Sequence, residues 1–89
     1  MAEIPIPADV YFRDFAFDVV KYEVKRKGTS IAVVDGLPNE EDGEKYIHIP
    51  HGSDVAVGDI LLSDGFRTTA RKISTDTYQG KPALLKVYF

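Results

Sequence analysis

Two histidines and two aspartates lie close together in the stretch HIPHGSDVAVGDIL: His48, His51, Asp54 and Asp59. Imidazole and carboxylate groups at such spacing could hold a metal ion or form an acid–base pair. A zinc site needs three or four donors that converge, and Pro50 turns the two imidazole rings away from each other. We therefore expect neither a metal nor any other cofactor here. His48 is predicted to end a strand and His51 to occupy a turn.

Other arrangements that support catalysis are missing from the sequence. The acidic residues at 40–42 and 44 lack the apolar surroundings that would raise the pKa of a carboxyl group, so they predict a solvated loop over residues 37–43. No serine lies in a G-x-S-x-G elbow, and the glycines never cluster as in a phosphate-binding loop. Without cysteine there is no disulfide, thiolate zinc site or thiol nucleophile. We expect a protein that is not an enzyme.

Length and composition indicate one small globular domain. The chain has 89 residues, of which 44% are hydrophobic and 28% are charged. We expect an extended lead-in over residues 1–8 and a single β-rich domain over residues 9–89. The start of the chain lacks the basic and apolar regions of a secretory signal, and no apolar run is long enough to span a membrane, so no membrane partner is expected.

The net charge of −3 conceals a strongly uneven distribution. Residues 29–65 contain eight acids and one base, whereas residues 66–89 contain five bases and one acid. Such a chain could fold into a particle with an acidic side and a basic side. Charge of this kind affects solubility and association more than it affects the fold.

Regularly spaced glycine turns between β-branched and aromatic runs predict a mainly β fold, a small antiparallel barrel or sandwich of the SH3-like or OB-like kind. Turns are predicted at residues 51–54 and 78–82. The strands are predicted at residues 30–35, 45–50, 60–63, 66–74 and 83–89. In the second of these, KYIHIP, Ile47 and Ile49 face one way while Tyr46 and His48 face the other.

The segment over residues 9–27 supports two interpretations. Asp9 as N-cap and Gly28 after the last turn favour a helix. Val, Phe and Tyr dominate the segment, however, and their alternation changes phase between Val19 and Val20 as at a β-bulge. We favour a long bent strand that pairs through residues 27–29 with residues 30–35. One short helix near the N-terminus remains the alternative.

More large apolar side chains are present than the core of so short a chain can hold. They are Tyr11, Phe12, Phe15, Phe17, Tyr22, Tyr78 and Tyr88. Some of them should lie in a contact with a partner, where Tyr and Phe are enriched. The last strand, PALLKVYF, must either be central in the sheet or offer its edge to another strand.

The candidate interaction surface lies in the basic C-terminal part of the chain. It consists of Arg67, Arg71, Tyr78, Lys81, Lys86, Tyr88 and Phe89. A basic strip with aromatic residues could also bind nucleic acid, with an affinity that falls as salt rises. Strand alternation puts Arg67 and Arg71 on the face of Ile73 and Lys72 on the other, so this strip is predicted to be split. Nucleic acid is therefore the alternative partner.

Residues 44–89 resemble the small β-barrels of tailed-phage connectors, namely the head-completion, stopper and tail-completion proteins. The similarity rests on VAVGDIL at 55–61, on Asp64-Gly65 and on the closing hairpin at 77–89. The G-K-x-Y-x-V pattern usual in that group is replaced here by GFRTTARKI.

This resemblance implies a structural protein without an active site that forms a ring, with acidic and basic sectors meeting between copies. The expected function is therefore that of a non-enzymatic assembly protein of phage or prophage origin. Its expected partners are other proteins or copies of itself. Its expected location is the bacterial cytoplasm or a virion.

Overall fold

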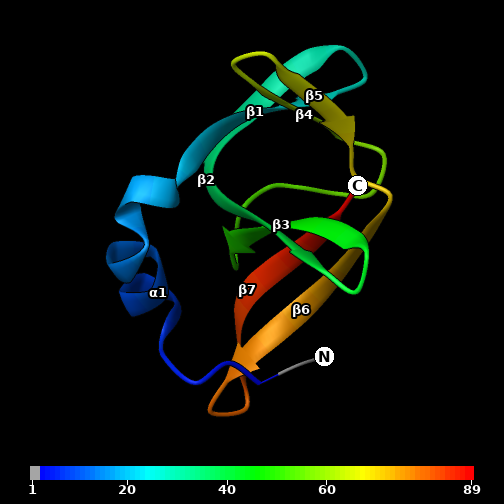
Figure 1. The fold of residues 1–89 in the computed structure, drawn as a ribbon. Coiled ribbons are helices and arrows are strands. Elements are labelled where there is room, and N and C mark those ends of the chain that lie inside the picture. The colour runs from blue at the N-terminus through cyan, green and yellow to red at the C-terminus, as the bar shows by residue number, and fades with distance from the viewer. Residues whose placement is uncertain (1–2) are drawn as a thin grey trace.

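A computed structural model describes residues 3–89, which form one antiparallel sheet of seven strands curled into a half-barrel, with a short helix beside it (Figure 1). The expected mainly β class is confirmed. The strand order is β5-β4-β1-β2-β3-β7-β6. Residues 1–2 of the predicted lead-in lie outside the described part of the chain. The elements are α1 (Ala8–Asp14), the 3₁₀ turn η1 (Ala16–Asp18), β1 (Val20–Arg26), β2 (Thr29–Glu41), β3 (Glu44–Pro50), β4 (Ile60–Ser63), β5 (Phe66–Thr69), β6 (Lys72–Tyr78) and β7 (Lys81–Tyr88).

Two-residue turns join several neighbouring strands. The predicted turns at Lys27-Gly28 and within residues 78–82 are confirmed, since they connect β1 to β2 and β6 to β7. The acidic loop predicted over residues 37–43 is wrong, because β2 continues to Glu41 and pairs with β3. Its turn is Asp42-Gly43, with φ of 52° and 79°, the left-handed conformation that closes a tight hairpin.

The long bent strand predicted over residues 9–27 is wrong in its first half. That half forms α1 and η1, and β1 begins only at Val20. The phase change at Val19–Val20 marks the end of η1, while the irregularity in the β1–β2 ladder lies between Val24 and Lys25. A helix of seven residues is only marginally stable by itself. It therefore depends on packing against the rest of the protein, which cannot be read from the residues of the helix alone.

The strand predicted over residues 66–74 is divided into β5 and β6. Between them Ala70, which is 1% exposed, turns into the core. Its N–H donates to the Asp59 carbonyl at 2.9 Å, and its carbonyl accepts from the Gly58 N–H at 2.8 Å. The final strand, β7, lies between β3 and β6, so the prediction that it could be central is confirmed.

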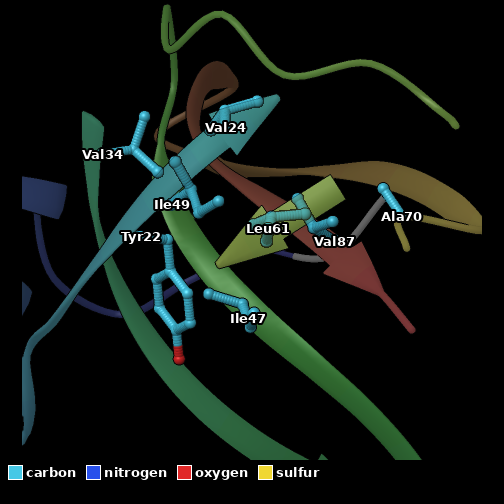
Figure 2. Packing of buried hydrophobic residues seen from close by; sticks show 8 residues of the cluster. All are labelled: Tyr22, Val24, Val34, Ile47, Ile49, Leu61, Ala70 and Val87. Carbon is cyan, nitrogen blue, oxygen red and sulfur yellow. The ribbon is translucent and has the colours of Figure 1, made fainter. Parts of the chain in front are cut away.

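The core fills the concave side of the half-barrel (Figure 2). Ile47 and Ile49 of β3 are completely buried in it, as their alternation predicts. Tyr46 and His48, on the opposite face of β3, are buried as well, at 4% and 8% exposure. The core cluster consists of Tyr22, Val24, Val34, Ile47, Ile49, Leu61, Ala70 and Val87.

Strand β2 changes partner at Gly36, and this change curls the sheet. Residues up to Gly36 pair with β1, and residues from Leu37 onward pair with β3. A Cβ atom on Gly36 would lie 2.6 Å from Cγ2 of Ile47 and 2.7 Å from the ring of Tyr22. Only glycine leaves room for these two core side chains to meet across the strand.

We predict that Gly36→Ala lowers the free energy of unfolding by about 1–3 kcal/mol, because the added methyl group overpacks a filled site. Urea unfolding followed by circular dichroism measures this. In a Tyr22→Leu background the same substitution should cost less, since one of the two side chains that obstruct the methyl group no longer reaches it. An equal cost in both backgrounds would contradict a contribution of the Tyr22 ring and assign the overpacking to Ile47.

The loop between β3 and β4 is fixed by a carboxylate. Asp59 is 3% exposed and accepts two hydrogen bonds from the Arg26 guanidinium of β1, at 3.0 Å and 2.9 Å. It also accepts the Ala56 N–H at 2.8 Å. Arg26 further donates to the exposed Asp54 at 3.0 Å. Mainly because of the hydrogen bonds from Arg26, the pKa of Asp59 is lowered below its ordinary value.

We predict that Asp59→Asn lowers the free energy of unfolding by about 2 kcal/mol, since a buried, charge-assisted contact is lost. Asp54→Asn removes a carboxylate from the same guanidinium at an exposed position, and should cost less than about 0.5 kcal/mol. The two variants can be compared by thermal and urea unfolding at pH 7. Equal costs would mean that Arg26 does not distinguish the two carboxylates.

Candidate functional site: an apolar pocket above a buried histidine

His48 is the centre of a buried polar network rather than an exposed ligand. Its Nε2 lies 2.9 Å from Oδ2 of Asp76, and its Nδ1 lies 3.0 Å from the Tyr11 hydroxyl. The ammonium group of Lys86 is 3.9 Å from the same Asp76 oxygen. Because the carboxylate accepts, Nε2 carries the hydrogen, and Nδ1 then accepts the hydrogen of the Tyr11 hydroxyl. Both nitrogens of the ring are therefore satisfied.

Three strands and the helix bring these residues together. His48 of β3 lies opposite Lys86 of β7, which lies opposite Ser74 of β6. Asp76 is two residues further along β6 and on the same face, while Tyr11 comes from α1. The sequence indicates Tyr11 only as one of the surplus aromatic residues and gives Asp76 no role, because the proximity of both to His48 depends on strand register and helix docking. The only sequence signal was that Asp76 is the single acid among residues 66–89.

Burial keeps both rings of this network neutral at pH 7. It lowers the pKa of His48 below the ordinary value of 6.5, against the opposing hydrogen bond and charge of Asp76. The pKa of the Tyr11 hydroxyl is raised, first by burial and then by the charge of Asp76. A neutral imidazole between a carboxylate and a phenol is suited to holding α1 against the sheet.

The four residues that suggested a metal site do not converge. His48 lies near the end of β3 and His51 is exposed in the following turn, as predicted. Asp54 and Asp59 both face Arg26 instead. Within residues 3–89, no group of three or more histidine, aspartate or glutamate side chains could hold a metal ion.

An apolar pocket of about 410 Å³ lies above the histidine. The N-terminal segment forms one wall, and it is held on β6 by a hydrogen bond of 2.7 Å from the Ile4 N–H to the Thr77 carbonyl. The carboxylate of Glu3 also accepts hydrogen bonds from the Thr77 hydroxyl and the Gln79 N–H. The pocket is lined by Ile4, Pro5, Ile6, Tyr11, Phe15, His48 and Leu84. The polar atoms of Tyr11 and His48 are hydrogen-bonded to each other, so the surface that the pocket presents to a ligand is mostly hydrocarbon.

Two aromatic side chains beside this pocket are exposed to solvent. Phe15, which contributes to the pocket wall, is 47% exposed, and Phe17 of η1 is 105% exposed. Among the described residues, the other large apolar side chains exposed to this degree are Val33 and Val57, which lie on β2 and in the loop before β4. Exposed aromatic residues next to an apolar pocket are typical of contact surfaces.

Part of the predicted interaction surface does come together around two tyrosine rings. The ammonium groups of Lys72 and Lys86 lie 4.3 Å and 4.6 Å from the ring centroids of Tyr88 and Tyr46. The guanidinium carbon of Arg71 is 5.8 Å from the Tyr88 centroid. The predicted split between Arg71 and Lys72 is wrong, because the strand breaks at Ala70 and the alternation does not continue across it.

Acidic residues neutralise this basic group. The guanidinium of Arg71 pairs with Glu44 at 2.6 Å. A hollow of about 270 Å³ next to it is lined by Glu41, Asp42, Glu44, Tyr46, Lys72 and Tyr88. The other predicted surface residues lie elsewhere: Arg67 is exposed on β5, Tyr78 and Lys81 flank the β6–β7 turn, and Phe89 packs on Phe66 with centroids 5.4 Å apart.

Comparison of the chain with protein-family models, with curated proteins and with solved structures finds no match. No helix among residues 3–89 has the length and apolar character needed to cross a membrane.

We predict that the protein loses stability as the pH falls below about 6.5, the ordinary pKa of histidine. The unfolded chain takes up a proton there that folded His48 resists, so acid favours unfolding. Urea unfolding measured from about pH 7.5 down to about pH 5, a range that brackets the histidine pKa, should show this slope. His48→Gln should flatten it, whereas the control His51→Gln should keep it. The reverse result would place the pH dependence outside the buried network.

Proposed function

We propose that this protein is a non-enzymatic assembly component that acts through protein–protein contacts, as part of a phage or prophage particle. The observation that carries the proposal is the pair of exposed aromatic side chains, Phe15 and Phe17, beside an apolar pocket. Burying such a side chain stabilises a contact by about 1.5–3 kcal/mol, and a folded domain gains nothing from leaving it in water. A partner that covers this region is the simplest reason for its composition.

The polar groups next to the pocket support a binding role rather than a chemical one. Tyr11 holds its proton more tightly than usual, and His48 is held neutral between Tyr11 and Asp76. A nucleophilic hydroxyl needs a pKa that lets its base remove the proton, whereas burial and the charge of Asp76 raise the pKa of Tyr11. The network is arranged to fix the helix and the pocket wall.

The phage setting rests on the resemblance of residues 44–89 to connector barrels. In the ring that this resemblance implies, the acidic and basic sectors of this chain would meet between neighbouring copies. Part of this pairing is already made within one chain here, through Arg71 and Glu44. The apolar region around Phe17 is therefore the better candidate for contacts between proteins.

Nucleic-acid binding is less well supported. The Tyr46 ring beside Lys86 is 4% exposed and cannot stack on a base, which leaves only the half-buried Tyr88 ring, already covered by Lys72 and Arg71. Acidic side chains line the adjoining hollow and would repel phosphates.

We predict that the protein either self-associates or binds a product of a neighbouring virion gene. Size-exclusion chromatography with light scattering tests the first outcome, at high protein concentration in low and high salt. Co-expression with the proteins encoded by adjacent genes tests the second. A protein that stays monomeric under all these conditions and binds none of those products would overturn the proposed function.

A further inference from the structure

We propose that the apolar pocket above His48 binds the Phe17 side chain of a second copy of this chain. The inference rests on the proposed function and deepens it, because it names both the partner and the contact. One copy supplies a projecting phenyl ring, and the other supplies a hydrocarbon pocket formed by its N-terminal segment, α1 and β7.

The chemistry of the pocket favours an apolar occupant. Aliphatic and aromatic side chains supply most of its lining, and its volume is about 410 Å³. The polar atoms at its floor are committed, since His48 binds Asp76 and Tyr11. A polar ligand would give up its bound water without finding a free donor in return, whereas a phenyl ring would lose nothing.

Phe17 has the properties of such an occupant. It is 105% exposed, so the pocket of its own chain does not hold it. It lies on η1, a single 3₁₀ turn that projects from the end of α1 (Figure 1). Phenylalanine buries more apolar area than most side chains, so one inserted ring can dominate a small contact.

The charges around the two surfaces are compatible with this contact. Asp18 follows Phe17 and is exposed, while Asp14, three residues before Phe17, is paired with Arg13 at 3.9 Å. The hollow next to the pocket is lined by residues that continue its walls, Pro7 after Ile6 and Ala83 before Leu84. Lys81 and Asp9 both line this hollow, and Lys81 offers an exposed cation to the Asp18 that follows an incoming Phe17.

The size of the contact sets its strength. One phenyl ring and its surroundings cover far less than the roughly 1,200 Å² of a stable interface. We therefore expect weak association that becomes firm only when repeated contacts close a ring.

Sedimentation equilibrium of the full chain at concentrations up to about 1 mM tests the inference, since a contact this small should be populated there. The wild-type protein should associate. Phe17→Ala and the pocket variant Ile6→Glu should each weaken the association at least about tenfold. Val57→Ala, which shortens a side chain that is 63% exposed elsewhere, should associate like the wild type. Thermal unfolding verifies that each variant is folded.

A mixing experiment separates this contact from any other. Phe17→Ala has an intact pocket, and Ile6→Glu has an intact Phe17. An equimolar mixture should therefore form a one-to-one complex at concentrations where each variant alone stays monomeric. Failure of the mixture to form this complex, or normal association of Phe17→Ala, would overturn the inference and leave the proposed function standing. A wild-type protein that stays monomeric but binds a neighbouring gene product would also overturn the inference and leave the proposed function standing. A wild-type monomer without any such partner would overturn both the inference and the proposed function.

Discussion

The close approach of two core side chains at Gly36 is the constraint on which the rest of this fold depends. Strand β2 pairs with β1 before this residue and with β3 after it, and the Tyr22 ring and Ile47 meet where any larger residue would place its side chain. Because Gly36 has no side chain, Tyr22 and Ile47 can pack directly against the backbone of β2, and the sheet can curl at this point. One small set of apolar residues then fills its concave side. Without that curvature, a sheet of seven short strands would leave its apolar face open to water.

Curling the sheet leaves β3 buried on both faces, and the second face explains the N-terminal region. Ile47 and Ile49 enter the core, while Tyr46 and His48 need a cover on the other side. Helix α1 provides this cover for His48 through Tyr11, while Tyr88 and Lys86 of β7 lie against the Tyr46 ring. Burying an imidazole requires partners for both nitrogens, and Asp76 and Tyr11 supply them. A helix too short to be stable alone is thereby fixed in place, and the apolar pocket is the space between it and the sheet.

The basic C-terminal surface and the aromatic surface at the end of α1 differ in how many of their groups have partners within the same chain. The basic groups of the C-terminal part lie against tyrosine rings and beside an acidic hairpin, so much of their charge is balanced within one molecule. At the end of α1, Phe15 remains about half exposed although its ring packs edge-on against Tyr11, and Phe17 is fully exposed. An exposed apolar side chain beside an apolar pocket is the reason that we propose an assembly role rather than binding to nucleic acid.

The sequence by itself determined the β class, the hairpin turns at Lys27-Gly28 and Gln79-Gly80, and the alternation of β3. These features depend on turn chemistry and a two-residue period, which are local. The Asp-Gly pair at residues 42–43 is also a local signal for a hairpin turn. The acidic residues around it favoured a solvated loop instead, so the turn was not predicted.

Only the tertiary structure decided between helix and strand for Ala8–Asp14 and Ala16–Asp18. It alone also decided that Asp59 anchors a loop through Arg26 and that His48 lies between Tyr11 and Asp76. The partners in that network are 37 and 28 residues from His48 in the chain. Strand register and the docking of a short helix bring them together, and both are set by the packing of the whole sheet rather than by any local run of residues.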